Sequence, residues 1–447
     1  MEKNMKKILM IGILTVIFGL ASLCVKSIIE ERVSMSDATQ LEIAESWSES
    51  QNFMAPMLCV PVCEEGRTVP YKCMYIMPDQ LNIDANVASE TLHRGIFDAS
   101  VYRSRITAKG IYNLKDTVTS TYDAELKKNV VYDWSRVQVV VGISDYNGIE
   151  EGMMMTLKDK KVELDHHYNN FGNQQMKAVL GDGQVAICGF VDLSDMKNRE
   201  LPFSMTTEIK GAGELFFAPI ARDSKITIHG NCPDPSFIGH SLPSSREVKD
   251  DGFTATWKVY GLNRGFDEQI FYTKGNTQIA PDPVGARLLV RGGQYTQTDR
   301  ALKYAFLVIL LALGAVFVGE MSVGSEINTL NYLLIGVAQV LFYLMLLSFA
   351  EWIGFGWAYL VSAVLILGLI AIYLKAIVKD QKTVVSISLF MLLVDVFIYA
   401  LLSIADMALL VGSLGLFFIL GVAMYFSLRI KFQIKSVGAP SQIINKE

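Results

Sequence analysis

Few residues of this chain have the types and spacing that metal binding requires. Cys59, Cys63 and Cys73 come closest, but a tetrahedral zinc site also needs a second cysteine pair or a nearby histidine, and the sequence places neither there. His166 and His167 are adjacent, and neighbouring side chains on a strand point to opposite faces. We therefore expect a surface polar pair here, and neither a metal site nor a cofactor.

Enzymatic motifs are equally scarce. None of the five histidines lies in an H-E-x-x-H frame or follows a G-x-S-x-G elbow. The carboxylates are scattered and form no evident acid–base couple, although folding could still assemble a catalytic triad from distant positions. The sequence accordingly favours a protein that is not an enzyme and keeps an enzyme of the polar region as a third, weaker alternative.

One ionisable residue does occupy a place where function is the default explanation. Asp395 lies near the middle of the apolar run Val384–Leu402, where a charged carboxylate is costly unless it is protonated, paired or beside water. The interpretations are polar packing between helices, a proton or ion relay, or a ligand contact. Side chains expected at a similar depth are Gln339, Tyr343, Ser362 and Tyr399.

The element that holds Asp395 is one of six apolar runs. A helix needs about 20 largely apolar residues to cross a hydrocarbon core of about 30 Å. The predicted spans are Ile8–Val25, Ala301–Gly319, Leu330–Ala350, Phe355–Leu374, Val384–Leu402 and Leu409–Leu428. We expect the first to be an uncleaved anchor rather than a cleaved signal peptide, because its apolar core is long and no small-x-small site follows. Short linkers between the later spans predict a compact antiparallel bundle.

Basic residues near the span ends predict the orientation. The three clusters expected on the cytoplasmic side are Lys3, Lys6 and Lys7; Lys375, Lys379 and Lys382; and Arg429, Lys431 and Lys435. Residues 1–7 are then a cytoplasmic N-terminus, 8–25 the first span, 26–300 a periplasmic domain, 301–428 a five-helix bundle and 429–447 a cytoplasmic tail.

Net charge is only −5 and the polar domain has no basic cluster, so nucleic acid is not expected as a partner.

The polar domain is predicted to be β-rich. Strand-forming runs at Met57–Val62, Lys72–Met77, Val137–Ile143, Val185–Leu193, Phe203–Ile209, Glu214–Ile220, Lys225–His229 and Phe253–Tyr260 recur between turn signals. Ser34–Ser50 is expected to form a helical stalk. The five cysteines of this domain are Cys59, Cys63, Cys73, Cys188 and Cys232, and both buried thiols and an opportunistic disulfide fit them.

Two polar segments stand out. Pro233 and Pro235 predict an ordered loop rather than a strand, with Phe237 and Trp257 either anchoring it to the core or forming a binding surface. Further along, the domain enters the second span through Tyr295, Thr298, Asp299, Arg300 and Lys303. There Thr298 or Asp299 is expected to cap the helix, and the segment to serve as a structural junction or a coupling point.

The remaining carboxylates of the apolar region are expected near lipid headgroups, where they are ordinary. They are Glu320, Glu326, Glu351 and Asp406. Depth therefore distinguishes Asp395 as the carboxylate that needs a partner.

The whole layout, together with several long motifs, resembles the CreD family of bacterial inner-membrane proteins. The matching text is Pro235-Ser-Phe-x-Gly239, Leu242-Pro243, Arg246-Glu-Val248, Gly252-Phe-x-Ala-x-Trp257, Tyr295-x-x-Thr-Asp-Arg-Ala301, Lys303-Tyr-Ala305, Asn331-Tyr-Leu-Leu-Ile-Gly336, Phe342-Tyr-Leu344, Glu351 with Gly354-Phe355, and Ser403-x-Ala-Asp406-x-Ala-Leu-Leu410. Asp299, Arg300, Glu351 and Asp406 fall within this text, whereas Asp395 does not.

The resemblance implies a role in envelope stress and cell-envelope integrity, with no known substrate, cofactor or catalytic residue. Our leading hypothesis is a non-enzymatic protein whose periplasmic domain binds a protein or envelope component, with membrane lipids and other copies of the chain as partners of the bundle. The alternative is a transporter or lipid-handling protein that uses Asp395, Glu351 and Asp406.

Overall fold

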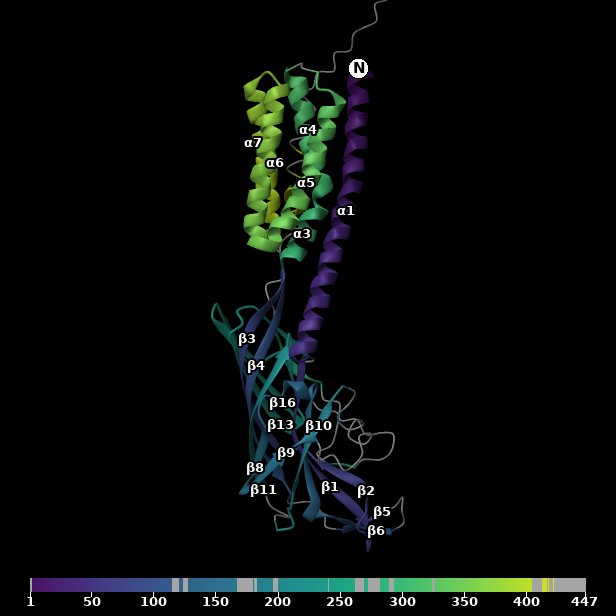
Figure 1. The fold of residues 1–447 in the computed structure, drawn as a ribbon, viewed down its shortest axis with the longest axis vertical. Helices are drawn as coiled ribbons and strands as arrows, with labels where there is room; N and C mark the ends of the chain where they lie inside the picture. Colours follow the sequence, from purple (N-terminus) through teal and green to yellow (C-terminus); the bar gives the residue numbers. More distant parts are fainter. Residues whose placement is uncertain are drawn as a thin grey trace, which may run out of the picture. The chain divides into compact units, whose positions relative to one another are not determined.

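The computed structural model divides the chain into two compact units, each described by itself (Figure 1). One consists of Met1–Met35 and Gly292–Glu447, and the other of Ser36–Arg291. The residues that the structure describes are 2–114, 120–123, 128–166, 180, 183–195, 200–239, 241–261, 269–271, 282–288, 293–323, 326–403, 412–415, 417 and 421.

The first unit is a bundle of apolar helices. Its helices are α1 (Glu2–Trp47, of which the unit takes the part up to Met35), α3 (Gly293–Lys303), α4 (Ala305–Val323), α5 (Thr329–Ile353), α6 (Phe355–Ile377) and α7 (Gln381–Ser403). Among the described residues, five of these helices are long and apolar enough to cross a membrane, namely all except α3. The prediction of a membrane protein is therefore confirmed. The sixth predicted span, Leu409–Leu428, lies almost wholly outside the described residues and stays a prediction.

Helix α1 is a packed member of this bundle rather than an isolated anchor. Its buried residues recur every three or four positions, at Ile11, Leu14, Phe18, Ser22, Val25 and Ile29, which is the spacing of one helix face. The ring of Phe18 lies so close to α5 that a Cβ built on Gly336 would be 2.1 Å from it. The opposite face, with Leu9, Ile13 and Leu20, is exposed and available to lipid. Close packing of this kind at glycine is common between membrane helices.

The second unit is β-rich and contains two sheets. The ten-stranded sheet comprises β1 (Gln51–Glu64), β2 (Pro70–Ile76), β5 (Ser120–Asp123), β6 (Lys128–Tyr132), β7 (Val137–Ile143), β10 (Val185–Val191), β12 (Glu214–Ala218), β14 (Pro235–Gly239), β17 (Gln269–Phe271) and β18 (Val284–Leu288). The eight-stranded sheet runs in the order β15 (Ser245–Lys249), β16 (Gly252–Tyr260), β13 (Asp223–Gly230), β3 (Gln80–Arg94), β4 (Phe97–Asn113), β11 (Glu200–Ala212), β8 (Met153–Leu157) and β9 (Lys160–Leu164).

Both sheets contribute to one hydrophobic core, and their burial patterns show how. Strand β3 alternates between buried and exposed residues over most of its length, so one face packs and the other meets solvent. Strand β7 is buried at every position, which fits its continuous run of β-branched residues. The β-rich prediction for this region is confirmed, and the predicted stalk is the uninterrupted continuation of α1 to Trp47.

The prediction of a loop around Pro235 is wrong. Pro235–Gly239 forms β14, which pairs antiparallel with β18 in the register Pro235 opposite Leu288. Proline is tolerated because β14 ends the sheet and Pro235 is its first residue, so the missing N–H does not interrupt a ladder on both sides.

Candidate functional site

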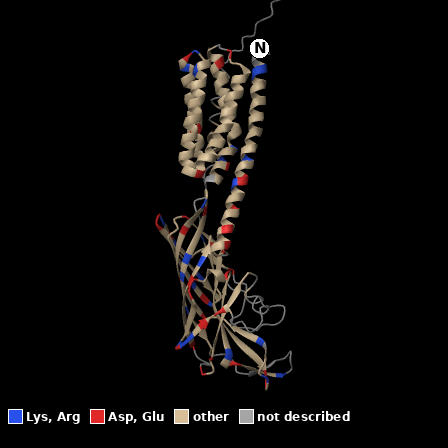
Figure 2. Cartoon of the chain, in the orientation of Figure 1, with Lys and Arg blue, Asp and Glu red and all other residues tan. Residues whose placement is uncertain are grey.

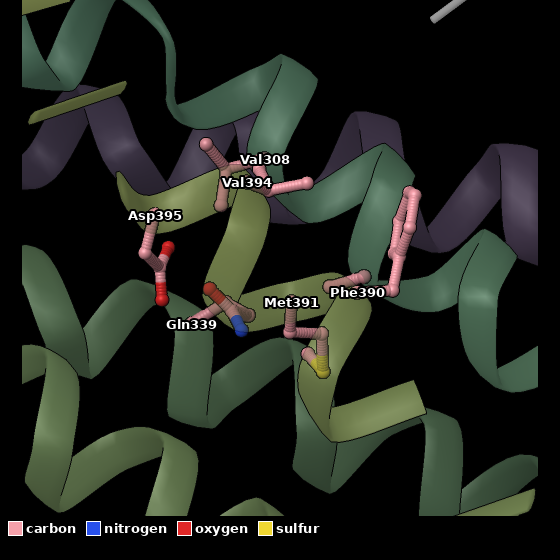
Figure 3. A pocket seen from close by; sticks show the side chains of 7 residues that line it. Val308, Gln339, Phe390, Met391, Val394 and Asp395 are labelled. Atoms are coloured by element: carbon pink, nitrogen blue, oxygen red, sulfur yellow. The ribbon is translucent and has the colours of Figure 1, made fainter. Parts of the chain in front are cut away.

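A small cavity within the helix bundle contains the carboxylate that the sequence singled out (Figure 3). It is lined by Val308 and Ala312 of α4, Gln339 of α5, and Phe390, Met391, Val394 and Asp395 of α7. Its volume is about 10 Å³, which is near the space that one water molecule needs. The cavity therefore brings a carboxylate and an amide together inside an otherwise apolar wall.

The Asp395 carboxylate receives no hydrogen bond from any residue that the structure describes. Tyr359 donates its hydroxyl to the main-chain carbonyl of Asp395 at 2.9 Å, which fixes the backbone but not the carboxylate. Gln339 is only 4% exposed and points into the same cavity, where its amide is the other polar group among the lining residues. Of the four partners expected from depth, Gln339 is the one that lines the cavity.

Two further hydroxyls of the bundle are buried without a hydrogen-bond partner among the described residues. They belong to Ser362 on α6 and Ser388 on α7. Ser388 precedes Asp395 by two helical turns, which places both on one face of α7. The rings of Tyr359 and Tyr399 lie beside this face, with centroids 5.2 Å apart. Such an arrangement could bind a proton or a small cation, because an unpaired intramembrane carboxylate is costly unless something neutralises it.

A second polar cluster joins three helices around Glu351. Tyr295 of α3 donates its hydroxyl to Glu351 Oε1 at 3.2 Å, and Arg32 Nε of α1 lies 3.6 Å from the same oxygen. The Glu351 side chain is 9% exposed, so it is not an ordinary headgroup carboxylate as its position in the sequence suggested. Arg32, which the sequence analysis missed, supplies the counter-charge.

The capping prediction for Thr298 and Asp299 is wrong. Helix α3 begins at Gly293, so both residues lie inside it, where their side chains cannot cap its first turn. Asp299 instead forms an ion pair with Lys303 one turn later, at 3.0 Å. Arg300 is exposed. Asp406, also predicted as a site residue, lies outside the described residues.

The most completely satisfied carboxylate of the bundle is Glu320, which the sequence placed among ordinary headgroup residues. Glu320 is 5% exposed. It accepts the Tyr332 hydroxyl at 2.6 Å and the Ile327 N–H at 3.0 Å, and it forms an ion pair with Lys7 of α1. The sequence did contain an indication of this ion pair, because Lys7 and Glu320 have opposite charges and are predicted to lie at the same membrane surface.

In the β-rich unit, the aromatic residues named from the sequence belong to the core. Trp257 is 1% exposed and donates its indole N–H to the Ser241 carbonyl at 3.1 Å. Phe237 is half-buried and packs edge-on against Trp257, with ring centroids 5.9 Å apart. The two rings therefore anchor the segment between β14 and β16.

The cysteines are free thiols in the structure, and all but Cys24 are buried. Burial raises the pKa of Cys59 well above its usual range, and the neighbouring thiol of Cys73 raises it further. In the part of the chain that the structure describes, no group of three or more histidine, cysteine or acidic side chains is placed to hold a metal ion.

These features define a class: an integral membrane protein with several apolar helices and a large β-rich unit inserted after the first of them. A sequence model of the family described as "Inner membrane protein CreD" matches residues 3–433, and the chain belongs to this family. The chain is also 28% identical over 401 residues to a protein of Escherichia coli (strain K12) named inner membrane protein CreD, covering 87% of this chain and 85% of that one.

Two solved structures are distantly similar to the chain. A crystal structure from Parabacteroides distasonis ATCC 8503 is similar at a TM-score of 0.21 and 10% identity, covering 60% of this chain and 50% of that one. The M1 zinc metallopeptidase of Deinococcus radiodurans gives a TM-score of 0.16 at 7% identity, covering 51% of this chain and 52% of that one. The chain thus spans about half the length of these structures, and similarity this low supports no argument about function.

Proposed function

We propose that this chain is a non-enzymatic inner-membrane protein that supports cell-envelope integrity under stress, through binding by its β-rich unit in the periplasm. The observation that carries the proposal is that the largest compact unit, Ser36–Arg291, builds a core of its own from two sheets in a member of the CreD family. A folded unit of this size is far more than a membrane anchor requires, and binding is the simplest use for it.

The distribution of charge supports the periplasmic placement. Lys6 and Lys7 precede the apolar part of α1, and Lys375, Lys379 and Lys382 surround the turn between α6 and α7. An alternating path through α1, α4, α5 and α6 brings both groups to one side of the membrane. The excess of basic residues there favours the cytoplasmic side, and the β-rich unit is then periplasmic.

Photocrosslinking in living cells tests the proposal. Probes belong at exposed apolar positions of the β-rich unit, namely Val69, Leu242 and Val248, which are 75%, 74% and 47% exposed. A probe at buried Trp257 is the control for non-specific capture. We expect a reproducible protein or envelope adduct from at least one exposed probe and none from Trp257. Adducts to lipid or to other copies of the chain alone would contradict the proposal.

A second function of a different class rests on the Asp395–Gln339 cavity. An unpaired carboxylate and a buried amide around a space of water size are suited to a proton or small cation that moves with a transported solute or lipid. This function requires Asp395→Asn to abolish activity while the protein level and the melting temperature stay normal. Wild-type behaviour of that variant would exclude it.

A further inference from the structure

The β-rich unit also contains a polar cleft that has no role in the functions proposed above. It has a volume of about 350 Å³, within the range of small-molecule sites. It is lined by residues of β1, of the β1–β2 turn, of β6 and of the short helix Trp134–Arg136 that follows, and by Ser194. The lining residues that carry charge are Glu64, Arg67, Asp133 and Arg136.

Arg136 is held rigidly at the edge of this cleft. Its Nε donates to Asp133 Oδ2 at 2.6 Å, and its Nη2 donates to the Thr68 carbonyl at 2.8 Å and lies 3.9 Å from Cys63 Sγ. Nη1 makes no hydrogen bond with any described residue. Nε and Nη2 are held by hydrogen bonds, whereas Nη1 is unpaired among the described residues. The guanidinium group is therefore already oriented to bind a carboxylate, because binding would cost little further side-chain entropy.

The Asp133 carboxylate, which holds Arg136 in place, is stabilised in its charged form. Asp133 is partly desolvated, which alone would raise its pKa, but hydrogen bonds from Ser135 and Arg136 outweigh this and keep the pKa below its usual range. Asp133 is therefore charged at neutral pH. Burial raises the pKa of Cys63 despite the nearby arginine, so this thiol stays protonated and is not an activated nucleophile.

The cleft also contains a negatively charged group, the Glu64 carboxylate, with one oxygen that accepts no hydrogen bond from a described residue. Glu64 receives Lys128 Nζ at 3.0 Å and Arg67 Nε at 3.2 Å, both on Oε2, while Oε1 has no hydrogen bond among the described residues. Apolar surface from Val131 and Trp134 completes the lining. The site thus offers a cationic donor, an anionic acceptor and an apolar wall.

We infer that this cleft binds a short free peptide, with its C-terminal carboxylate on Arg136 Nη1 and its N-terminal ammonium group on Glu64 Oε1. The inference rests on the proposed function, since it names the chemical class that the β-rich unit binds. A zwitterionic ligand is favoured over a simple anion, because only the zwitterion has a cationic donor for Glu64 Oε1, the oxygen that Lys128 and Arg67 leave unpaired.

Calorimetric titration of the purified full-length protein in detergent tests the inference, with trialanine as the probe. Saturable binding is expected at millimolar concentration or below, with trialanine amide weaker by about tenfold or more because it lacks the charged partner of Arg136. Arg136→Gln should produce a loss of the same size, whereas Arg103→Gln, at an arginine paired with Glu150 on the other sheet, should bind as wild type.

A second variant guards against a folding defect in Arg136→Gln. Glu64→Gln should weaken trialanine severalfold and leave N-acetyltrialanine unchanged, because the acetyl group removes the ammonium. No saturable binding, equal affinity for trialanine and its amide, or inorganic phosphate binding as tightly as trialanine would each overturn the inference. The crosslinking test of the proposed function reports on any partner of the β-rich unit, so its outcome is independent of this one.

Discussion

The helix bundle and the β-rich unit use charged side chains in opposite ways (Figure 2). In the bundle, charged residues gather near the helix ends, and the middles of the helices are almost free of them. Glu320 and Glu351 are nevertheless buried, and each has a basic partner on α1. In the β-rich unit, arginine–carboxylate pairs such as Arg103–Glu150 and Arg287–Glu214 are partly exposed.

This difference indicates where electrostatics stabilises the fold. Exposed pairs contribute little, because water and salt screen them, whereas breaking a buried pair leaves an uncompensated charge. The charged groups to examine for function are then those left without an internal partner. Among the described residues they include Asp395 in the bundle, and Arg136 Nη1 and Glu64 Oε1 in the cleft.

The largest effect should come from Glu320. Glu320→Ala removes the acceptor for Lys7, Tyr332 and the Ile327 N–H, so we expect a loss of about 3–5 kcal/mol in stability. The measurement is the thermal unfolding of the protein in detergent. Glu31→Ala, at an exposed carboxylate of α1, is the matched control and should change little. Equal effects of the two substitutions would remove the distinction between buried and exposed carboxylates.

The packing of α1 should rank next. Gly336→Leu places a side chain where the Phe18 ring now lies, and overpacking of this kind costs about 1–3 kcal/mol. Adding Phe18→Ala to the same chain should recover part of the loss, as a double-mutant cycle in detergent would show. Gly368→Leu, with open space around its Cβ position, serves as the control. Without such recovery, direct contact between α1 and α5 would be in doubt.

A smaller effect is expected at the Glu351 cluster. Tyr295→Phe removes one hydroxyl that donates to Glu351, and because this hydrogen bond is long, at 3.2 Å, its loss should cost no more than about 1.5 kcal/mol. The unfolding temperature should fall less than in Glu320→Ala, because Arg32 still neutralises Glu351. A drop as large as that of Glu320→Ala would mean that the hydroxyl, rather than the arginine, stabilises this carboxylate.

The smallest effect belongs to the exposed pairs of the β-rich unit. A double-mutant cycle on Arg103 and Glu150, which are 3.0 Å apart, should give a coupling of about 0.2–1 kcal/mol that decreases as salt is added. Coupling comparable to that of Lys7 and Glu320 would erase the contrast between the two units.

Apolar periodicity was sufficient to predict most of the architecture. Of the five C-terminal spans predicted, four coincide with α4 to α7. A long uncharged apolar run of this length forms few structures other than a membrane-spanning helix. The two longest strands, β3 and β4, were missed, although Leu81, Ile83, Ala85 and Val87 alternate as a half-buried strand requires. Their polar outer faces lowered the overall hydrophobicity and concealed the pattern.

The polar clusters were harder to predict, since they depend on which helices become neighbours. Asp395 was identified by its depth alone, and Gln339 by a similar depth. Lys7 and Glu320 are far apart in the chain, as are Arg32 and Glu351, and no local pattern links the members of either pair. The Arg136 cleft arises from three separate segments, so only folding brings its charges together.

Whether the β-rich unit provides the function is tested by comparing two alleles in a strain that lacks the chromosomal gene. Each allele, Arg136→Gln or Asp395→Asn, is expressed at wild-type level, and survival under an envelope-directed toxin is measured. If the β-rich unit provides the function, Arg136→Gln should lose protection and Asp395→Asn should retain it. Full protection by Arg136→Gln together with its loss in Asp395→Asn would instead place the function in the helix bundle.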